Sequence, residues 1–146
     1  VWSNDRVMSS QYSTCVYHKG HLYGVHGRQD IGVAALRCFE AKTGKVKWTE
    51  TRFGMATLIL ADGKLLIMKT DGRLVLAEAS PEGFVRLAGA EVFNRTSRAL
   101  PALSNGRLYV RDQGPRSGLL KCLDFLVKSL KSLYRMFLKN FYPVVF

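Results

Sequence analysis

The sequence predicts an all-β fold: a partial β-propeller of about three four-stranded blades, followed by a C-terminal amphipathic helix. Three short blocks resemble one another, and each places a turn dipeptide with glycine before a run rich in Leu, Tyr, Val and Ile. The glycines are Gly20, Gly63 and Gly106, which are 43 residues apart each time. A period of about 40 to 45 residues with four strands per unit is typical of a propeller blade.

The units contain a similar succession of strand candidates, four in the first two units and three in the third. Unit by unit, they are 13–17, 19–25, 35–40 and 45–50; 56–60, 62–68, 73–78 and 84–90; and 99–103, 105–111 and 119–123. No window before residue 119 has the apolar spacing of three and four that a helical repeat requires, so helical solenoids are excluded. A single sandwich or barrel of about a dozen strands is the alternative, but it gives no reason for a glycine register to repeat.

Composition places the chain among globular domains. It has 146 residues, of which 47% are hydrophobic, so it has enough apolar side chains to build a core and wholesale disorder is excluded. Its net charge of +11 favours anionic partners. Nucleic acid is not expected among them, because aromatic residues do not interleave with the basic ones in a pattern fit to stack bases. No apolar run approaches the ~18 residues of a membrane-spanning helix.

Residues 36–48 resemble the signature of the pyrroloquinoline-quinone-like (PQQ-like) propeller repeat, which reads Ala-x-Asp-x-x-Thr-Gly-x-x-x-Trp. Thr43, Gly44 and Trp48 match this signature, and Glu40 stands where the family has Asp. The match implies that Thr-Gly forms a hairpin between the third and fourth strands of a blade. It also implies that the Trp ring packs against a neighbouring blade.

The other units carry weaker forms of the same motif. The third unit repeats its start and reaches Asp124, and the second has a degenerate version at 76–83. Trp2 lies 46 residues before Trp48, and we interpret it as the closing residue of an earlier blade. The resemblance therefore covers residues 1–124, which we take as a domain of propeller repeats.

The resemblance says more about fold than about activity. Quinone-dependent members of the superfamily hold their cofactor with carboxylates and an Asn around calcium, a stacking Trp and a pair of adjacent cysteines. This sequence has no adjacent cysteines. It is therefore most similar to the non-catalytic branch, such as the barrel-assembly lipoprotein of bacterial outer membranes. That branch implies a binding or scaffold module without a cofactor, in the periplasm or another extracytoplasmic compartment. The alternative is a fragment of a quinone- and calcium-dependent oxidoreductase whose active site lies in missing blades.

No residue is assigned a catalytic, cofactor-binding or metal-binding role. His18, His21 and His26 are close enough in sequence to suggest a metal site. The 43-residue register, however, places Ala, Ser, Lys, Arg and Asp at the equivalent positions of later units, which is typical of variable strand ends and turns. A metal site also needs further ligands, and no Cys or carboxylate is placed convincingly beside these histidines.

The cysteines and glycines have structural interpretations as well. Cys38 and Cys122 occupy the same place in units one and three, which favours buried, apolar roles, and Cys15 lies in a first strand. The glycines at 24, 27 and 32 are not followed by the strand-glycine-helix order of a phosphate loop. Residues 27–33, which include Arg28 and Asp30, are instead predicted to connect two strands of one blade.

Residues 125–146 depart from the repeat and predict a basic amphipathic helix of about 17 residues that ends at Pro143. Its basic side chains are Lys128, Lys131, Arg135 and Lys139. Its apolar face comprises Leu126, Leu130, Leu133, Phe137 and Phe141. Three interpretations stay open: the helix covers the last blade or pairs with another chain, it lies on an anionic membrane surface, or the tail is not native to the propeller. We favour the first and third over the membrane.

Three blades are fewer than the four to eight of a closed propeller, so both flanks of the arc lack a neighbour. We therefore predict a protein partner, or self-association, through the open blade edges. The chain opens at Val1 with no basic segment before an apolar one. We expect no signal peptide of its own, and we interpret the chain as part of something longer.

Overall fold

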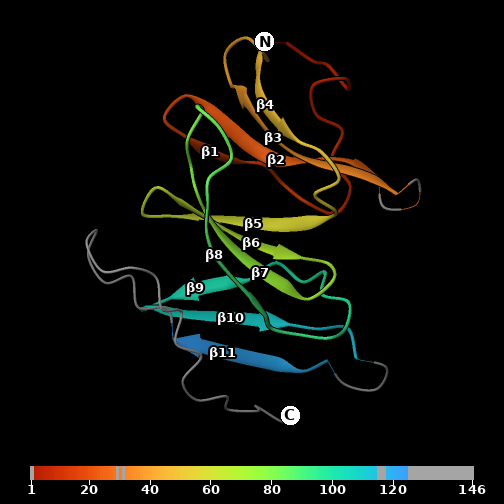
Figure 1. Cartoon of the computed structure of the whole chain (residues 1–146), viewed down its shortest axis with the longest axis vertical. Coiled ribbons are helices and arrows are strands. Elements are labelled where there is room, and N and C mark those ends of the chain that lie inside the picture. The colour runs from red at the N-terminus through yellow and green to blue at the C-terminus, as the bar shows by residue number, and fades with distance from the viewer. Residues whose placement is uncertain (1, 29, 31, 115–117, 125–146) are drawn as a thin grey trace.

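The computed structural model describes residues 2–124 except for 29, 31 and 115–117. In this part of the chain, eleven strands form three antiparallel sheets, and no helix is present. Figure 1 shows that the sheets follow one another along the long axis in chain order. The prediction of an all-β fold made of repeated sheets is confirmed. The helix predicted within 125–146 lies outside the described residues.

The three sheets are named A, B and C. Sheet A contains, in order, β1 (Val16–His18), β2 (His21–Arg28), β3 (Val33–Glu40) and β4 (Val46–Glu50). Sheet B contains β5 (Ala56–Ala61), β6 (Lys64–Lys69), β7 (Arg73–Glu78) and β8 (Arg86–Glu91). Sheet C contains β9 (Ala102–Ser104), β10 (Arg107–Arg111) and β11 (Leu120–Asp124). Within the described residues sheet C thus has three strands, which match the three strand candidates predicted for the third unit.

The repeated glycines lie in equivalent hairpins. Each hairpin has a two-residue turn, Lys19–Gly20, Asp62–Gly63 or Asn105–Gly106, between its first two strands. Both residues of every turn have positive φ, from 45° to 48° at the first position and from 66° to 83° at the glycine. This is the pattern of a type I′ turn, whose twist matches that of the flanking strands. The 43-residue register therefore reflects one hairpin built three times.

Two first strands begin later than the sequence predicted. The expected strand at 13–17 is β1, and the expected strand at 99–103 is β9. Pro101 cannot donate to a strand ladder, so β9 begins after it. Upstream of Pro101, the backbone N–H of Ser97 donates to the carbonyl of Thr70 at 3.0 Å and does not pair with a strand of sheet C.

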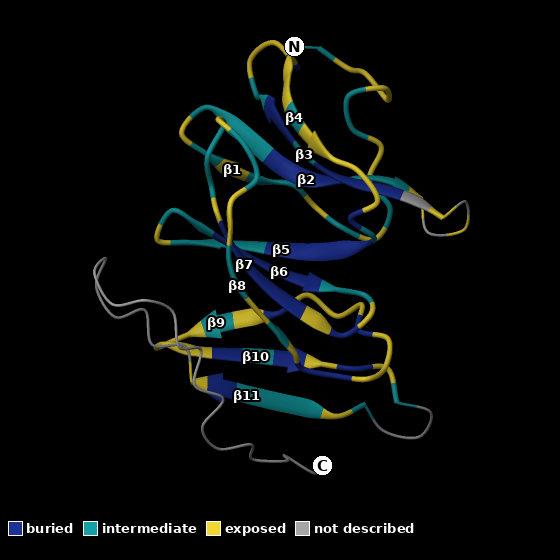
Figure 2. Cartoon of the chain, in the orientation of Figure 1, coloured by how far each residue is buried: buried dark blue, intermediate teal, exposed yellow. Residues whose placement is uncertain are grey.

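Two apolar clusters hold the sheets together. The cluster between sheets A and B contains Tyr23, Val25, Ala34, Leu36, Cys38, Phe53, Met55, Ala56, Leu58, Leu65, Ile67, Val75 and Ala77. The cluster between sheets B and C contains Leu66, Met68, Leu74, Leu76, Val92, Phe93, Leu108, Val110 and Leu123. Successive side chains of β6 enter opposite clusters, as the two-residue period of a strand requires. Sheet B is therefore buried on both faces (Figure 2).

Residues 2–15, which we call the N-terminal strap, lie mainly against the face of sheet A that points away from sheet B, and Gln11 and Tyr12 of the strap also approach sheet B. The Arg37 guanidinium donates to the carbonyls of Arg6 and Val7, each at 2.8 Å. The N–H of Gly27 donates to the carbonyl of Ser9 at 2.8 Å. These contacts fix the strap mainly through its backbone, which explains why its sequence has no strand periodicity.

Trp2 and Trp48 make the same kind of contact with the sheet that follows each of them. The Trp2 indole donates to the carbonyl of Ala41 in sheet A, and the Trp48 indole donates to that of Ser80 in sheet B, both at 2.9 Å. Both acceptors lie in the turn between the third and fourth strands of a sheet. Trp2 also rests on Gly44, where an added Cβ would stand 3.1 Å from its ring.

Candidate functional site

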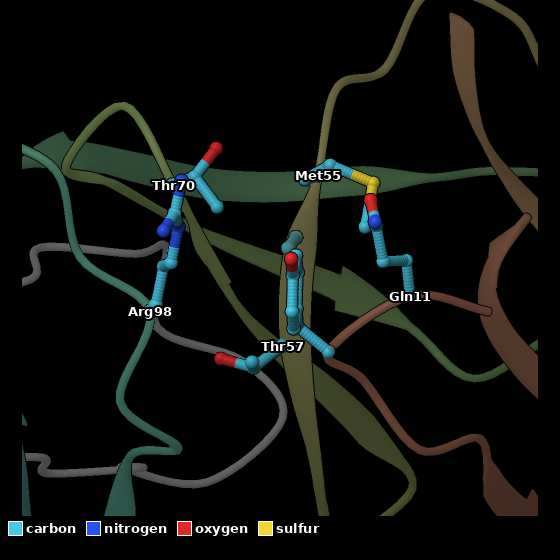
Figure 3. A pocket seen from close by; sticks show the side chains of 7 residues that line it. Gln11, Met55, Thr57, Thr70 and Arg98 are labelled. Atoms are coloured by element: carbon cyan, nitrogen blue, oxygen red, sulfur yellow. The ribbon is translucent and has the colours of Figure 1, made fainter. Parts of the chain in front are cut away.

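A small hollow lies where the strap, sheet B and the segment before β9 come together. It has about 220 Å³ of empty space, part of it open to solvent, and its lining residues are Gln11, Tyr12, Met55, Ala56, Thr57, Thr70 and Arg98. In Figure 3, Arg98 and Thr70 lie on one side and Gln11 and Met55 on the other, with Thr57 between them. We call this feature the hollow.

Backbone hydrogen bonds fix the walls of the hollow. Thr57 lies in β5 and pairs with Met68 of β6, so its position is set by the ladder of sheet B. The N–H of Thr70 donates to the carbonyl of Met55 at 2.9 Å, which joins two walls directly. The carbonyl of Thr70 accepts from Ser97 at 3.0 Å, and this bond places the neighbouring Arg98 at the rim.

The polar groups of the hollow differ in their surroundings. Thr57 is 7% exposed, and its buried hydroxyl has no hydrogen-bond partner among the described atoms. The Arg98 guanidinium lies 5.6 Å from the centre of the Tyr12 ring, a cation–π distance that orients both side chains. No Asp or Glu belongs to the lining. The described residues that line the hollow are therefore neutral apart from Arg98, which is positively charged.

Sequence reasoning did not find this site. The lining residues come from the strap and from two different units, so no local motif joins them. One signal was available: Thr57 is a polar residue inside the apolar strand 56–60. A polar residue inside an apolar strand indicates a buried hydroxyl, and a buried hydroxyl requires a hydrogen-bond partner.

The repeat-motif residues lie in a turn of sheet A, outside the hollow. The Thr43 hydroxyl donates to the Glu40 carboxylate and accepts the N–H of Lys45 at 3.2 Å. Gly44 has a positive φ of 74° and donates its N–H to the Glu40 carbonyl at 2.9 Å. These bonds shape the turn on which Trp2 rests. Asp124, at the end of β11, pairs with Arg107 across the strands at 3.7 Å.

The three histidines are spread along one hairpin. His18 and His21 flank the Lys19–Gly20 turn, while His26 lies near the other end of β2. Among residues 2–124, with the stated gaps, no three His, Cys, Asp or Glu side chains gather in a group that could hold a metal ion. In the same part of the chain, no helix has the length and apolarity needed to cross a bilayer.

His26 ties the strap to sheet A and makes this contact sensitive to pH. The N–H of Ser9 donates to Nδ1 of His26 at 3.0 Å, so this nitrogen carries no proton. Burial, and then repulsion by Arg37, hold the pKa of His26 below its usual value of 6.5. The unfolded chain therefore takes up this proton at higher pH than the folded chain does.

We predict that the stability contributed by neutral His26 is complete above pH 6.5 and is lost as the pH falls through the folded pKa. Thermal unfolding of the wild type and of His26→Asn should diverge in this range, because the Asn oxygen accepts the Ser9 bond without titrating. His18→Asn is the control, and it should follow the wild type. Parallel pH profiles for the wild type and His26→Asn would contradict the prediction.

The cysteines are all free thiols. Cys38 is fully buried in the cluster between sheets A and B, while Cys15 and Cys122 are half-buried. Burial raises the pKa of the Cys15 and Cys38 thiols. Both therefore favour the protonated form, which is a poor nucleophile.

Sheets A and C each contain a tyrosine that pairs with a cysteine on the neighbouring strand. Tyr109 pairs with Cys122 across β10 and β11, as Tyr23 pairs with Cys38 across β2 and β3. Tyr23 and Cys38 are fully buried against sheet B. Leu108 faces sheet B, so Tyr109 and Cys122 point away from it, and both are only half-buried. We call this side the outer face of sheet C.

Comparison with known proteins supports the fold. No protein-family model matches the chain, and no curated protein matches it either. Among solved structures it is similar to a europium-containing methanol dehydrogenase, with a TM-score of 0.59 and 14% identity over 76% of this chain and 22% of that one. It is also similar to the computationally designed Ika8 protein, with a TM-score of 0.59 and 14% identity over 84% of this chain and 36% of that one.

A third similar structure is the computationally designed Ika4 protein, with a TM-score of 0.56, 15% identity, and coverage of 87% of this chain and 80% of that one. The chain thus corresponds to about a fifth of the methanol dehydrogenase and about a third of Ika8. Likeness at this identity shows fold alone. It supports the propeller fold that the repeats predicted, as an arc of three sheets within the described residues.

Proposed function

We propose that this chain is a non-catalytic binding or scaffold module built on an arc of PQQ-like propeller blades. The observation that carries the proposal is the outer face of sheet C. It presents the Tyr109–Cys122 pair in the register in which sheet A presents Tyr23–Cys38 to sheet B. Sheet C therefore has the kind of face that, two sheets earlier, receives another sheet.

The second candidate is a fragment of a quinone- and calcium-dependent oxidoreductase whose active site lies in missing blades. The structural likeness between this chain and a methanol dehydrogenase favours the oxidoreductase fragment, but this likeness concerns the fold alone. The residue inventory favours the binding module, because no two cysteines are adjacent and no group of potential metal ligands gathers in the described part of the chain.

Calorimetric titration separates the two candidates. We expect no stoichiometric heat when the chain is titrated with pyrroloquinoline quinone, with calcium, or with both together. Sub-micromolar binding of the quinone in the presence of calcium would contradict the non-catalytic proposal and support the oxidoreductase fragment.

A second measurement tests the scaffold part of the proposal. We propose that the outer face of sheet C packs against a second copy of the chain, which supplies the apolar neighbour that this face lacks among the described residues. Sedimentation velocity should then show concentration-dependent association that Tyr109→Arg abolishes. Tyr17→Arg, at an exposed tyrosine of β1, is the matched control and should leave association intact. A monomer at every concentration would contradict this contact.

A further inference from the structure

The contact between sheets A and B is built around a row of three side chains on neighbouring strands. Tyr23 of β2 pairs with Cys38 of β3, and Cys38 pairs with Trp48 of β4. The ring centre of Trp48 lies 6.1 Å from that of Tyr23, and its indole donates to the carbonyl of Ser80 at 2.9 Å. A tryptophan from the fourth strand thus completes the face that sheet A presents and also bonds to the next sheet.

Sheet C carries the first two members of this row. Tyr109 of β10 pairs with Cys122 of β11, and both are half-buried on the outer face. The outermost described strand of the sheet is β11, so among the described residues no strand places a third side chain beside Cys122. The outer face of sheet C therefore presents a tyrosine and a cysteine without the tryptophan that covers their counterparts in sheet A.

The other end of the stack has the tryptophan without the tyrosine and cysteine. Trp2 contacts sheet A much as Trp48 contacts sheet B, because its indole donates to the carbonyl of Ala41 at 2.9 Å and its ring centre lies 6.1 Å from that of Phe39. No described strand precedes β1, so the described part of the chain provides no sheet in front of Trp2. Sheets A and C lie at opposite ends of the molecule (Figure 1). Each end therefore holds one half of a contact that is complete between sheets A and B.

We propose that copies of this chain associate head to tail, with the outer face of sheet C in one copy packed on the strap and sheet A of the next. Trp2 of the second copy then lies beside Cys122 and against Tyr109 of the first, while its indole keeps the bond to Ala41 of its own chain. The inference rests on the proposed function as a scaffold module, and it names the surface that the second copy supplies.

A two-fold contact between two sheet C faces fits these residues less well. In such a contact, a surface of one copy meets the same surface of the other. Arg107 and Arg111 lie on the side of β10 that carries Tyr109, and both are exposed. Their side chains would meet their own counterparts, and neither copy would bring a tryptophan to Cys122. The head-to-tail contact joins two different faces, so it avoids this pairing of like charges and uses Trp2.

Complementation between two variants of the full chain tests the polarity of the contact. Tyr109→Arg damages the sheet C side and keeps Trp2, whereas Trp2→Ala damages the strap side and keeps Tyr109. In sedimentation velocity, each variant alone should associate about tenfold more weakly than the wild type, or less. An equimolar mixture should form a complex of two chains with wild-type affinity, because each variant contributes one undamaged half of the contact.

Two controls separate the contact from folding. Trp2 belongs to neither apolar cluster, so Trp2→Ala should keep the three sheets, and circular dichroism of the dilute variant checks this. Trp2→Phe keeps a ring for the neighbouring copy and loses only the bond to Ala41 of its own chain. It should therefore associate more tightly than Trp2→Ala.

Two results would overturn the inference and leave the non-catalytic scaffold proposal standing. One is association of Trp2→Ala at wild-type affinity, which indicates that sheet C meets another surface. The other is a mixture of the two variants that associates no better than the variants do alone. A wild-type chain that stays monomeric at every concentration is a different result, because it contradicts the sheet C contact of the proposed function and this inference together.

Discussion

Replacing Trp48 with alanine is expected to lower the free energy of unfolding by about 3 kcal/mol or more. The indole packs with its ring centre 6.1 Å from those of Tyr23 in β2 and Phe84 in the segment before β8. Its N–H also donates to the Ser80 carbonyl at 2.9 Å. Alanine removes both the apolar contacts and the hydrogen bond that joins the sheets. Urea unfolding followed by circular dichroism measures the loss.

Trp48→Phe is the matched control for this substitution. It keeps an aromatic ring in the cluster but cannot donate to Ser80, so its expected cost is about 1 kcal/mol from the hydrogen bond, plus the smaller ring's lost contacts. A loss of less than about 1 kcal/mol in Trp48→Ala itself would show that the ring does not join the sheets.

Gly72→Ala is expected to cost more than about 3 kcal/mol, or to prevent folding. Gly72 is buried, has a positive φ of 89° and accepts hydrogen bonds at its carbonyl from the N–H groups of Val92 and Phe93. A Cβ at this position would stand 2.0 Å from the carbonyl oxygen of Phe93. Backbone atoms cannot rotate away as a flexible side chain does, so the segment leading to sheet C must move.

Gly20→Ala separates the cost of backbone strain from the cost of this clash. Gly20 has a similar φ of 83°, but no atom lies within 4 Å of an added Cβ. We expect a loss of about 1–2 kcal/mol, the cost of a left-handed conformation for a residue with a side chain. Equal losses in the two variants would show that the close approach of Phe93 does not matter.

The repeat was predictable from sequence because its cause is local. A two-residue hairpin turn demands positive φ at two successive positions, and only a few residue types meet this demand, as at Asn105–Gly106. The strands that flank the turns follow from their apolar composition. The strap was not predictable, because its place on sheet A depends on distant groups such as Arg37 and His26 that bond to its backbone.

The hollow was harder to foresee for the same reason. Gln11, Thr57 and Arg98 meet only after two sheets have packed and a connecting segment has been fixed by Ser97. None of these residues occupies a motif position. The contacts of the two tryptophans were predictable in part. Their spacing predicted contact with a neighbouring blade, but only the structure identifies the acceptor carbonyls of Ala41 and Ser80.

Sheet B is buried on both faces, and we expect it to be the most stable of the three sheets against local unfolding. In a linear stack in which each layer contacts only its neighbours, stability is a sum of layer and interface terms, and the middle layer takes part in both interfaces. Amide protons of β6 and β7 can therefore exchange with solvent only through the rarest openings, while those of β1 and β11 exchange through fraying of an outer layer. Protection against exchange then declines outward in both directions from the middle of the sequence.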